Sequence, residues 1–216
     1  EPEHILSVFE NASDDLRVGD RDERVFVVAA PTTVDWAVLG LQTWDSDMWV
    51  EADEPIDVAD NTWLHEYVHS RQQLNTTNAT SWLTEATATY HAAALALEGN
   101  LTGFADFRDV LRRGTRDRYD DVVLSDPTTW TRRANYDKGG LVVGTLDRQI
   151  RLATNRSRTF ETLFGQLNDR EGPFDQATFL QLVDDIGNET VRATADRYVT
   201  TDDGPSTWTR EQHERA

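Results

Sequence analysis

Apolar residues recur with a helical period over most of the chain after residue 80. Spacings of three and four residues between apolar side chains are typical of amphipathic helices, and turn-forming residues separate the runs. The run at 82–98 is rich in alanine, so we expect its neighbours to pack closely against it. The segments predicted to be helical are 82–98, 104–113, 139–153, 160–167, 174–186 and 189–198, the last stopped by Asp202–Pro205.

The first fifty or so residues carry strand patterns instead. The β-branched run 24–30, which ends at Pro31, predicts a buried strand, and 48–52 predicts a second strand. Residues 1–23 are polar and mixed, and their short apolar patch fits either a helical turn or a first strand. These patterns predict a small sheet that precedes the helices in the chain.

A helix predicted to begin between Pro55 and Asp57 connects the two parts, with Asp57 or Asp60 able to cap its backbone amides. A chain of 216 residues can bury one sizeable core. We therefore expect a single α+β domain, with a mixed sheet over this helix, a helical lobe and a cleft between them. The predicted domain spans 1–216: a mainly β part at 1–54, a mainly helical part at 55–205 and a tail at 206–216.

The charge of the chain is strongly negative. The formal net charge is −18, and Lys138 is the only lysine beside twenty arginines. Such a surface repels nucleic acid and anionic membranes, so we expect neither as a partner. An acidic excess with almost no lysine resembles proteins of salt-loving archaea, so we expect loss of fold or activity in low salt. The acidic segment 45–60 lacks the spaced pattern of a calcium-binding loop.

The chain has no cysteine, which excludes disulfides and thiolate chemistry within it. No apolar run approaches the length needed to span a bilayer, so we expect no membrane insertion in this segment. Six asparagines open an Asn-x-Ser/Thr sequence, which is more than a chain of this composition predicts and favours an exported, extracellular or cell-surface glycoprotein. These asparagines are Asn11, Asn75, Asn78, Asn100, Asn155 and Asn188.

The strongest chemical signal is the motif His65-Glu66-x-x-His69 in the first predicted helix. Residues four apart lie on one face of a helix, so both imidazoles can reach one cation while the carboxylate of Glu66 stands beside it. The alternative is a pair of surface histidines on an ordinary helix. Five histidines in 216 residues make such a motif rare by chance, so the sequence favours a zinc hydrolase.

A catalytic zinc needs three protein ligands and an open fourth position. After His69 no histidine occurs until His91. Between them, Glu85 is the last residue of the segment Trp-Leu-Thr-Glu at 82–85. The two segments together resemble the glutamate zincins, in particular the glycyl aminopeptidase and aminopeptidase N families. Tyr136 and the Lys-Gly pair that follows it resemble a third segment of these families, and Gly40–Gln42 resembles their substrate-lining strand.

This resemblance implies a zincin-like, thermolysin-like catalytic domain with one Zn²⁺ held by His65, His69 and Glu85. Zinc so held lowers the pKa of a bound water toward neutrality. Glu66 is then the general base that activates this water and later protonates the leaving amine. Tyr136 is expected to hydrogen-bond the oxyanion that forms on the scissile carbonyl, a contact typically worth a few kcal/mol. The expected reaction is hydrolysis of a bond in a peptide or protein substrate.

The chain departs from these families at Gln42, where they carry a glutamate that binds the free amino terminus of the substrate. An amide cannot form that ion pair, which favours an endopeptidase over an aminopeptidase. The interval from His69 to Glu85 is also shorter than is usual in the aminopeptidase N family. The alternatives that stay open are an aminopeptidase and, outside enzymes, a zinc-bound or inactive scaffold domain at the cell surface.

Four further residues have structural alternatives to a role in the chemistry. Thr89, one turn after the glutamate ligand, fits either support of the ligands or a bond to its own helix backbone. We expect His91 to be packed rather than metal-bound, and Lys138 to have a structural role at a helix start. Gln72 is expected to belong to the core or to a wall of the cleft.

Overall fold

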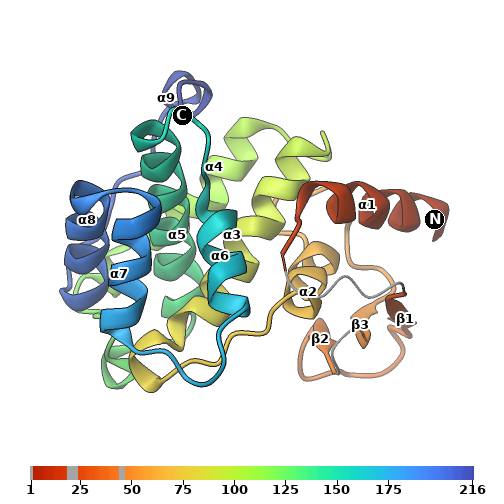
Figure 1. The fold of residues 1–216 in the computed structure, drawn as a ribbon. Helices are drawn as coiled ribbons and strands as arrows, with labels where there is room; N and C mark the ends of the chain where they lie inside the picture. The colour runs from red at the N-terminus through yellow and green to blue at the C-terminus, as the bar shows by residue number, and fades with distance from the viewer. Residues whose placement is uncertain (1, 19–23, 44–46) are drawn as a thin grey trace.

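The fold is mixed, with a small sheet and two helices beside a larger group of helices (Figure 1). The computed structural model describes residues 2–18, 24–43 and 47–216. Parts of the polar segment 1–23 and of the acidic segment 45–60 therefore lie outside the described residues. Within the described ranges, no helix is both long and apolar enough to cross a bilayer. The α-helices are α1 (Pro2–Asp15), α2 (Thr62–Ser70), α3 (Trp82–Glu98), α4 (Phe104–Arg112), α5 (Ala134–Ala153), α6 (Phe160–Asn168), α7 (Gln176–Ile186), α8 (Glu189–Thr200) and α9 (Arg210–Glu214).

Most predicted helices are confirmed within one or two residues, and the differences lie at their ends. The helix predicted at 139–153 begins five residues earlier, at Ala134, so α5 includes the whole Tyr136 segment. In the predicted tail, 210–214 forms the short helix α9. At the N-terminus the two alternatives for 1–23 resolve into α1, a helix of 14 residues. Short 3-10 helices form the remaining turns: η1 (Asn78–Thr80), η2 (Arg113–Thr115), η3 (Asp117–Tyr119) and η4 (Pro127–Thr129).

The sheet contains β1 (Phe26–Ala30), β2 (Gly40–Gln42) and β3 (Asp47–Glu51) in the order β1-β3-β2. Strand β1 pairs with β3 in parallel and β2 pairs with it antiparallel, so the sheet is mixed, as expected. Met48 and Val50 of β3 are buried, and α2 packs on both β2 and β3. One face of the sheet therefore covers the helix that carries the histidine motif.

The prediction that 24–30 is a buried strand is wrong. Phe26 is 65% exposed and Val28 is 41% exposed, because β1 lies at an edge and its outer face is uncovered in the described chain. Val28 and Leu41 both pair with Trp49, so these three side chains share this open face of the sheet. The ring of Trp36 lies 5.0 Å from that of Trp49.

Helix α2 starts at Thr62 and not between Pro55 and Asp57, and neither predicted aspartate caps it. The cap is Asn61, whose Oδ1 accepts a hydrogen bond from the backbone amide of Leu64 at 3.0 Å. Asn61 is 2% exposed, and a neutral amide caps a buried helix end without the cost of burying a charge. The shorter α2 places the motif residues in its middle.

Helices α3 and α5 pack along each other, and small residues bring them close together (Figure 1). A Cβ at Gly139 would lie 2.8 Å from the Cβ of Ala86, and one at Gly144 would lie 2.9 Å from the Tyr90 ring. Close backbone approach of this kind requires residues without large side chains. The packing places Tyr136, at the start of α5, opposite the glutamate of α3.

Lys138 has the structural role that its position predicts. It is 1% exposed, and its Nζ donates hydrogen bonds to the carbonyl oxygens of Val122 and Asp202, each at 2.6 Å. Burial lowers the pKa of this ammonium, and nearby aspartates oppose that effect. The lysine therefore joins the loop before α5 to the chain that follows α8.

Candidate metal centre

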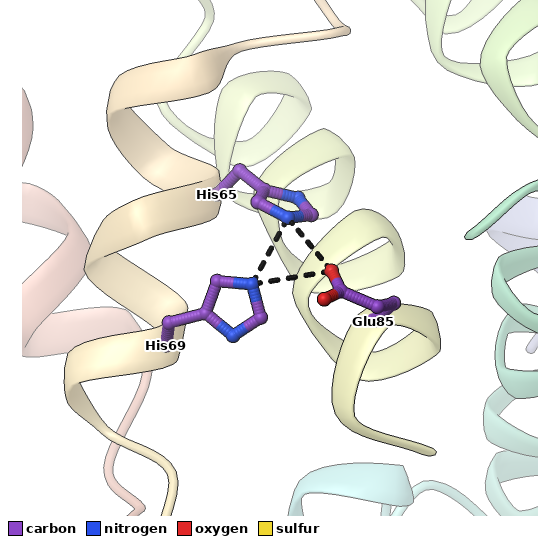
Figure 2. A group of neighbouring side chains, drawn as sticks. All are labelled: His65, His69 and Glu85. Atoms are coloured by element: carbon purple, nitrogen blue, oxygen red, sulfur yellow. Dashed lines mark hydrogen bonds and ion pairs between the residues drawn. The ribbon is translucent and has the colours of Figure 1, made fainter. Parts of the chain in front are cut away.

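The three predicted ligands converge on one point in space, between α2 and α3 (Figure 2). The Nε2 atoms of His65 and His69 lie 3.1 Å apart, and each lies 3.3 Å from Oε2 of Glu85. The two imidazoles come from successive turns of α2, and the carboxylate comes from the first turn of α3. Each side chain is partly buried, at 14–23% exposure, so the group opens to solvent on one side.

These separations fit a small tetrahedral cation. Zinc binds histidine nitrogen and carboxylate oxygen at about 2.0–2.2 Å, which in a tetrahedron places the donor atoms roughly 3.3–3.5 Å from one another. The observed separations of 3.1–3.3 Å lie at or just below this range. Two neutral imidazoles, one carboxylate and one open side form the donor set of a catalytic zinc site. The residues therefore fit this ion.

Gln72 orients His69, a role that the sequence did not suggest. Its Oε1 lies 2.9 Å from Nδ1 of His69, so the imidazole donates from Nδ1 and directs the lone pair of Nε2 toward Glu85. The amide nitrogen of Gln72 donates in turn to the carbonyl of Thr84 and to Oγ1 of Thr87, both at 2.7 Å. The signal that could have revealed this contact is the spacing of three residues from His69 to Gln72.

Glu66 lies beside the ligands and is held by strand β2. It is 7% exposed, and its Oε2 accepts a hydrogen bond of 2.7 Å from the backbone amide of Gln42. The strand approaches so closely because residue 40 is glycine: a Cβ there would lie 2.9 Å from Cγ of Glu66. Gln42 therefore contacts the carboxylate of Glu66 through its backbone amide, whereas the resemblance pointed to the Gln42 side chain.

Tyr136 lies against His65 in the same group. The two rings are stacked, with centroids 5.7 Å apart and an angle of 8° between their planes. Burial raises the pKa of this phenol above its usual value, and the negative charge of Glu85 raises it further, so the hydroxyl keeps its proton at neutral pH. Tyr136 therefore places a protonated phenol beside His65, and its contact with an oxyanion stays a prediction.

The surroundings of Glu66 and Glu85 shift the pKa values of these two carboxylates in opposite directions. Burial raises the pKa of Glu66, and the nearby imidazoles only partly oppose that effect. Burial also acts to raise the pKa of Glu85, but its contacts with His65 and His69 outweigh burial and hold the pKa well below the usual range. The surroundings therefore favour the ionised form of Glu85, and they favour the protonated form of Glu66 more than water does.

A cleft with a volume of about 310 Å³ is lined by His65, Glu66 and Tyr136 of this group. Val38, Leu39 and Gly40 line its sheet side, and Tyr136 and Arg133 of the α5 start line the helical side. The cleft therefore lies between the sheet and the helical lobe, as the sequence predicted. Arg133, which the sequence did not suggest, places its guanidinium carbon 4.2 Å from the centre of the Tyr136 ring.

Thr89 and His91 lie on α3 after Glu85, and the sequence-based expectation is confirmed only for His91. Oγ1 of Thr89 is buried and has no hydrogen-bond partner among the described residues, so neither role predicted for this threonine is seen there. His91 is packed, as expected, with its ring stacked on Phe164 at a centroid distance of 5.5 Å. It does not belong to the group of donor atoms at the metal centre. Burial lowers the pKa of His91 to about 4, so the ring is neutral at pH 7.

Comparisons with protein-family models, curated proteins and solved structures returned no match. The functional assignment therefore depends on the residues and the geometry of the site.

Proposed function

We propose that this chain is a zinc-dependent peptidase of the glutamate-zincin type, with a thermolysin-like catalytic domain. The observation that carries the proposal is the convergence of three donor atoms within 3.1–3.3 Å, at the residues that the motif and its resemblance select. Their order along the chain and the two-helix arrangement also suit this type. When bound, zinc would supply Lewis-acid activation of water and of the scissile carbonyl.

The protein's own residues then have separate tasks. Glu66 takes a proton from the attacking water and passes it to the leaving amine; its raised pKa suits both directions. The backbone amide of Gln42 holds this carboxylate in place. Tyr136 keeps its proton and donates a hydrogen bond to the carbonyl oxygen as negative charge develops on it. Gln72 holds His69 in the tautomer that a metal ligand requires.

We propose an endopeptidase in preference to an aminopeptidase, because residue 42 is an uncharged glutamine, which cannot form an ion pair with a free amino terminus. The alternative outside enzymes is a zinc-bound or inactive scaffold domain. For location we propose the cell exterior or surface, and this is supported by the exposure of all six sequon asparagines. These residues are Asn11, Asn75, Asn78, Asn100, Asn155 and Asn188.

Metal analysis and one substitution test the proposal. The purified protein in high salt should contain about one zinc per chain, and Glu66→Gln should retain the metal and the fold. Because a general base typically contributes 10²–10⁴-fold, peptide cleavage by this variant should fall by about that factor. Glu189→Gln, an exposed change of the same kind on α8, is the control and should cleave normally.

Absence of bound zinc would refute the metallopeptidase, and unchanged cleavage by Glu66→Gln would refute the assigned base. Zinc binding without cleavage of any peptide would favour the scaffold alternative. An N-acetylated peptide and its free-amine form separate the two peptidase modes, since an aminopeptidase requires the amine. Equal cleavage of the two forms is the result expected for an endopeptidase.

A further inference from the structure

Arg133 is a charged residue of the cleft with no task in the proposed reaction. It caps the start of α5: the backbone amide of Asp137 donates to its carbonyl oxygen at 2.8 Å. Its guanidinium lies over the ring of Tyr136, whose centre is 5.7 Å from that of His65. The guanidinium carbon lies 4.2 Å from the centre of the Tyr136 ring. The charge of Arg133 therefore lies within about 10 Å of the centre of the His65 ring. An extended peptide covers that distance in roughly three residues.

Two other arginines near the start of α5, Arg113 and Arg118, have carboxylate partners. Arg118 lies 3.1 Å from Asp137, and Arg113 forms an ion pair with Asp60. No carboxylate of the described chain lies within 4.0 Å of a nitrogen of Arg133. In a chain with a net charge of −18, a cleft guanidinium without a described carboxylate partner stands out.

The chemistry of the cleft favours an anionic ligand group at this position. Arginine presents a planar fork of donors that matches a carboxylate, and stacking on an aromatic ring orients the fork and leaves its edge free to bind. The cleft's own exposed carboxylate, Asp60, is already paired with Arg113. A substrate carboxylate can therefore approach Arg133 without displacing a described ion pair.

We infer that Arg133 determines specificity by binding a carboxylate of the peptide substrate within about three residues of the scissile bond. This inference rests on the proposed peptidase function and adds a substrate class to it. The carboxylate has two sources, an aspartate or glutamate side chain and a free C-terminus. A substrate rich in acidic residues offers the first source, and a short peptide offers the second.

Two families of matched peptides test the inference in high salt. The first scans one aspartate, against asparagine, through the three positions on each side of the cleaved bond. The second compares a free C-terminal acid with its amide at one to three residues after that bond. At one of these positions the acid should have the higher kcat/KM, by about tenfold, because a bidentate charged contact is strong but salt weakens it.

In Arg133→Gln this preference should fall to less than twofold. Arg133→Lys, which keeps the charge but loses the fork, should show an intermediate preference. The control is Arg132→Gln, which removes the same charge from the adjacent exposed residue and should keep the full preference. Folding of each variant is checked by its thermal unfolding and by its zinc content.

The competing explanation is that Arg133 only orients Tyr136. In that case Arg133→Gln lowers kcat equally for acid and neutral peptides and leaves the preference unchanged, which overturns the inference. A wild-type protein without any preference also overturns it, while peptide cleavage itself still supports the proposed function. If no peptide is cleaved, calorimetric dissociation constants of the same pairs decide: a tenfold preference lost in Arg133→Gln supports the inference, and equal binding overturns it.

Discussion

The sheet and the helical lobe use their apolar residues in opposite ways. In the lobe, Phe164 is fully buried and packs against the ring of His91. In the sheet, Phe26 is 65% exposed on an edge strand, although its sequence context is equally apolar. The comparison teaches that the lobe provides a dense core and carries Glu85, whereas His65 and His69 lie on α2, against the sheet. The sheet packs on α2 with its inner face, where Met48 and Val50 are buried, while its outer face is exposed in the described chain.

The two regions meet at one place that matters for the chemistry. Strand β2 lies against α2 at Gly40, and its next residues bring the amide of Gln42 to Glu66. We therefore expect the sheet to affect activity through this contact more than it affects stability. Substitutions in each region can separate these two effects.

The largest expected difference is between two phenylalanines. Phe164→Ala removes a fully buried ring and should lower the free energy of unfolding by about 3–5 kcal/mol, because it leaves a cavity in the lobe. Phe26→Ala removes an exposed ring and should change the same quantity by less than about 0.5 kcal/mol. Denaturant unfolding in constant high salt measures both. Similar losses would show that the sheet face is covered in solution.

The next effect is a pH dependence that originates in the lobe. His91 has its pKa lowered to about 4 by burial, against about 6.5 in the unfolded chain. Between these values only the unfolded chain binds the proton, so stability is complete above pH 6.5 and falls toward pH 4, by roughly 3 kcal/mol. His91→Phe should lack this part of the pH dependence in unfolding measurements. His4→Gln, at an exposed histidine, is the control and should keep it.

The smallest effect is at the junction of the two regions. Gly40→Ala would place a Cβ 3.2 Å from the backbone oxygen of Trp49 and 2.9 Å from Cγ of Glu66. The strand must shift, which should cost about 1–3 kcal/mol and reduce peptide cleavage at least tenfold by loosening the contact with Glu66. Gly165→Ala on α6 is the matched control, because a Cβ there meets nothing within 4 Å. It should be neutral or slightly stabilising, by about 0.5–1 kcal/mol.

Equal activity of the two glycine variants would contradict the role of the sheet in holding Glu66. Activity is measured on the same peptide and salt as the wild type, and stability by denaturant unfolding. A fall in activity larger than the fall in stability is the expected sign of a local displacement at the site.

Local patterns in the sequence were sufficient for the helices α3 to α8 and for the pair of histidines, whereas the resemblance to the glutamate zincins selected Glu85. The helical periods located α3 to α8 because a helix repeats every 3.6 residues, so its spacing is visible in the chain. The spacing of His65 and His69 predicted two ligands on one face for the same reason. The donor atoms lie together as predicted, and Glu85 joins them from the next helix.

Only the tertiary structure decided the contacts between residues that are distant or irregular in the chain. Burial of the end of α2 selected Asn61 as its cap, and the edge position of β1 with its uncovered face exposed a strand that its β-branched run predicted to be buried. Packing of α5 on α3 stacked Tyr136 on His65 and placed Arg133 in the cleft. Such contacts depend on how elements pack together, and no spacing within one element encodes that packing.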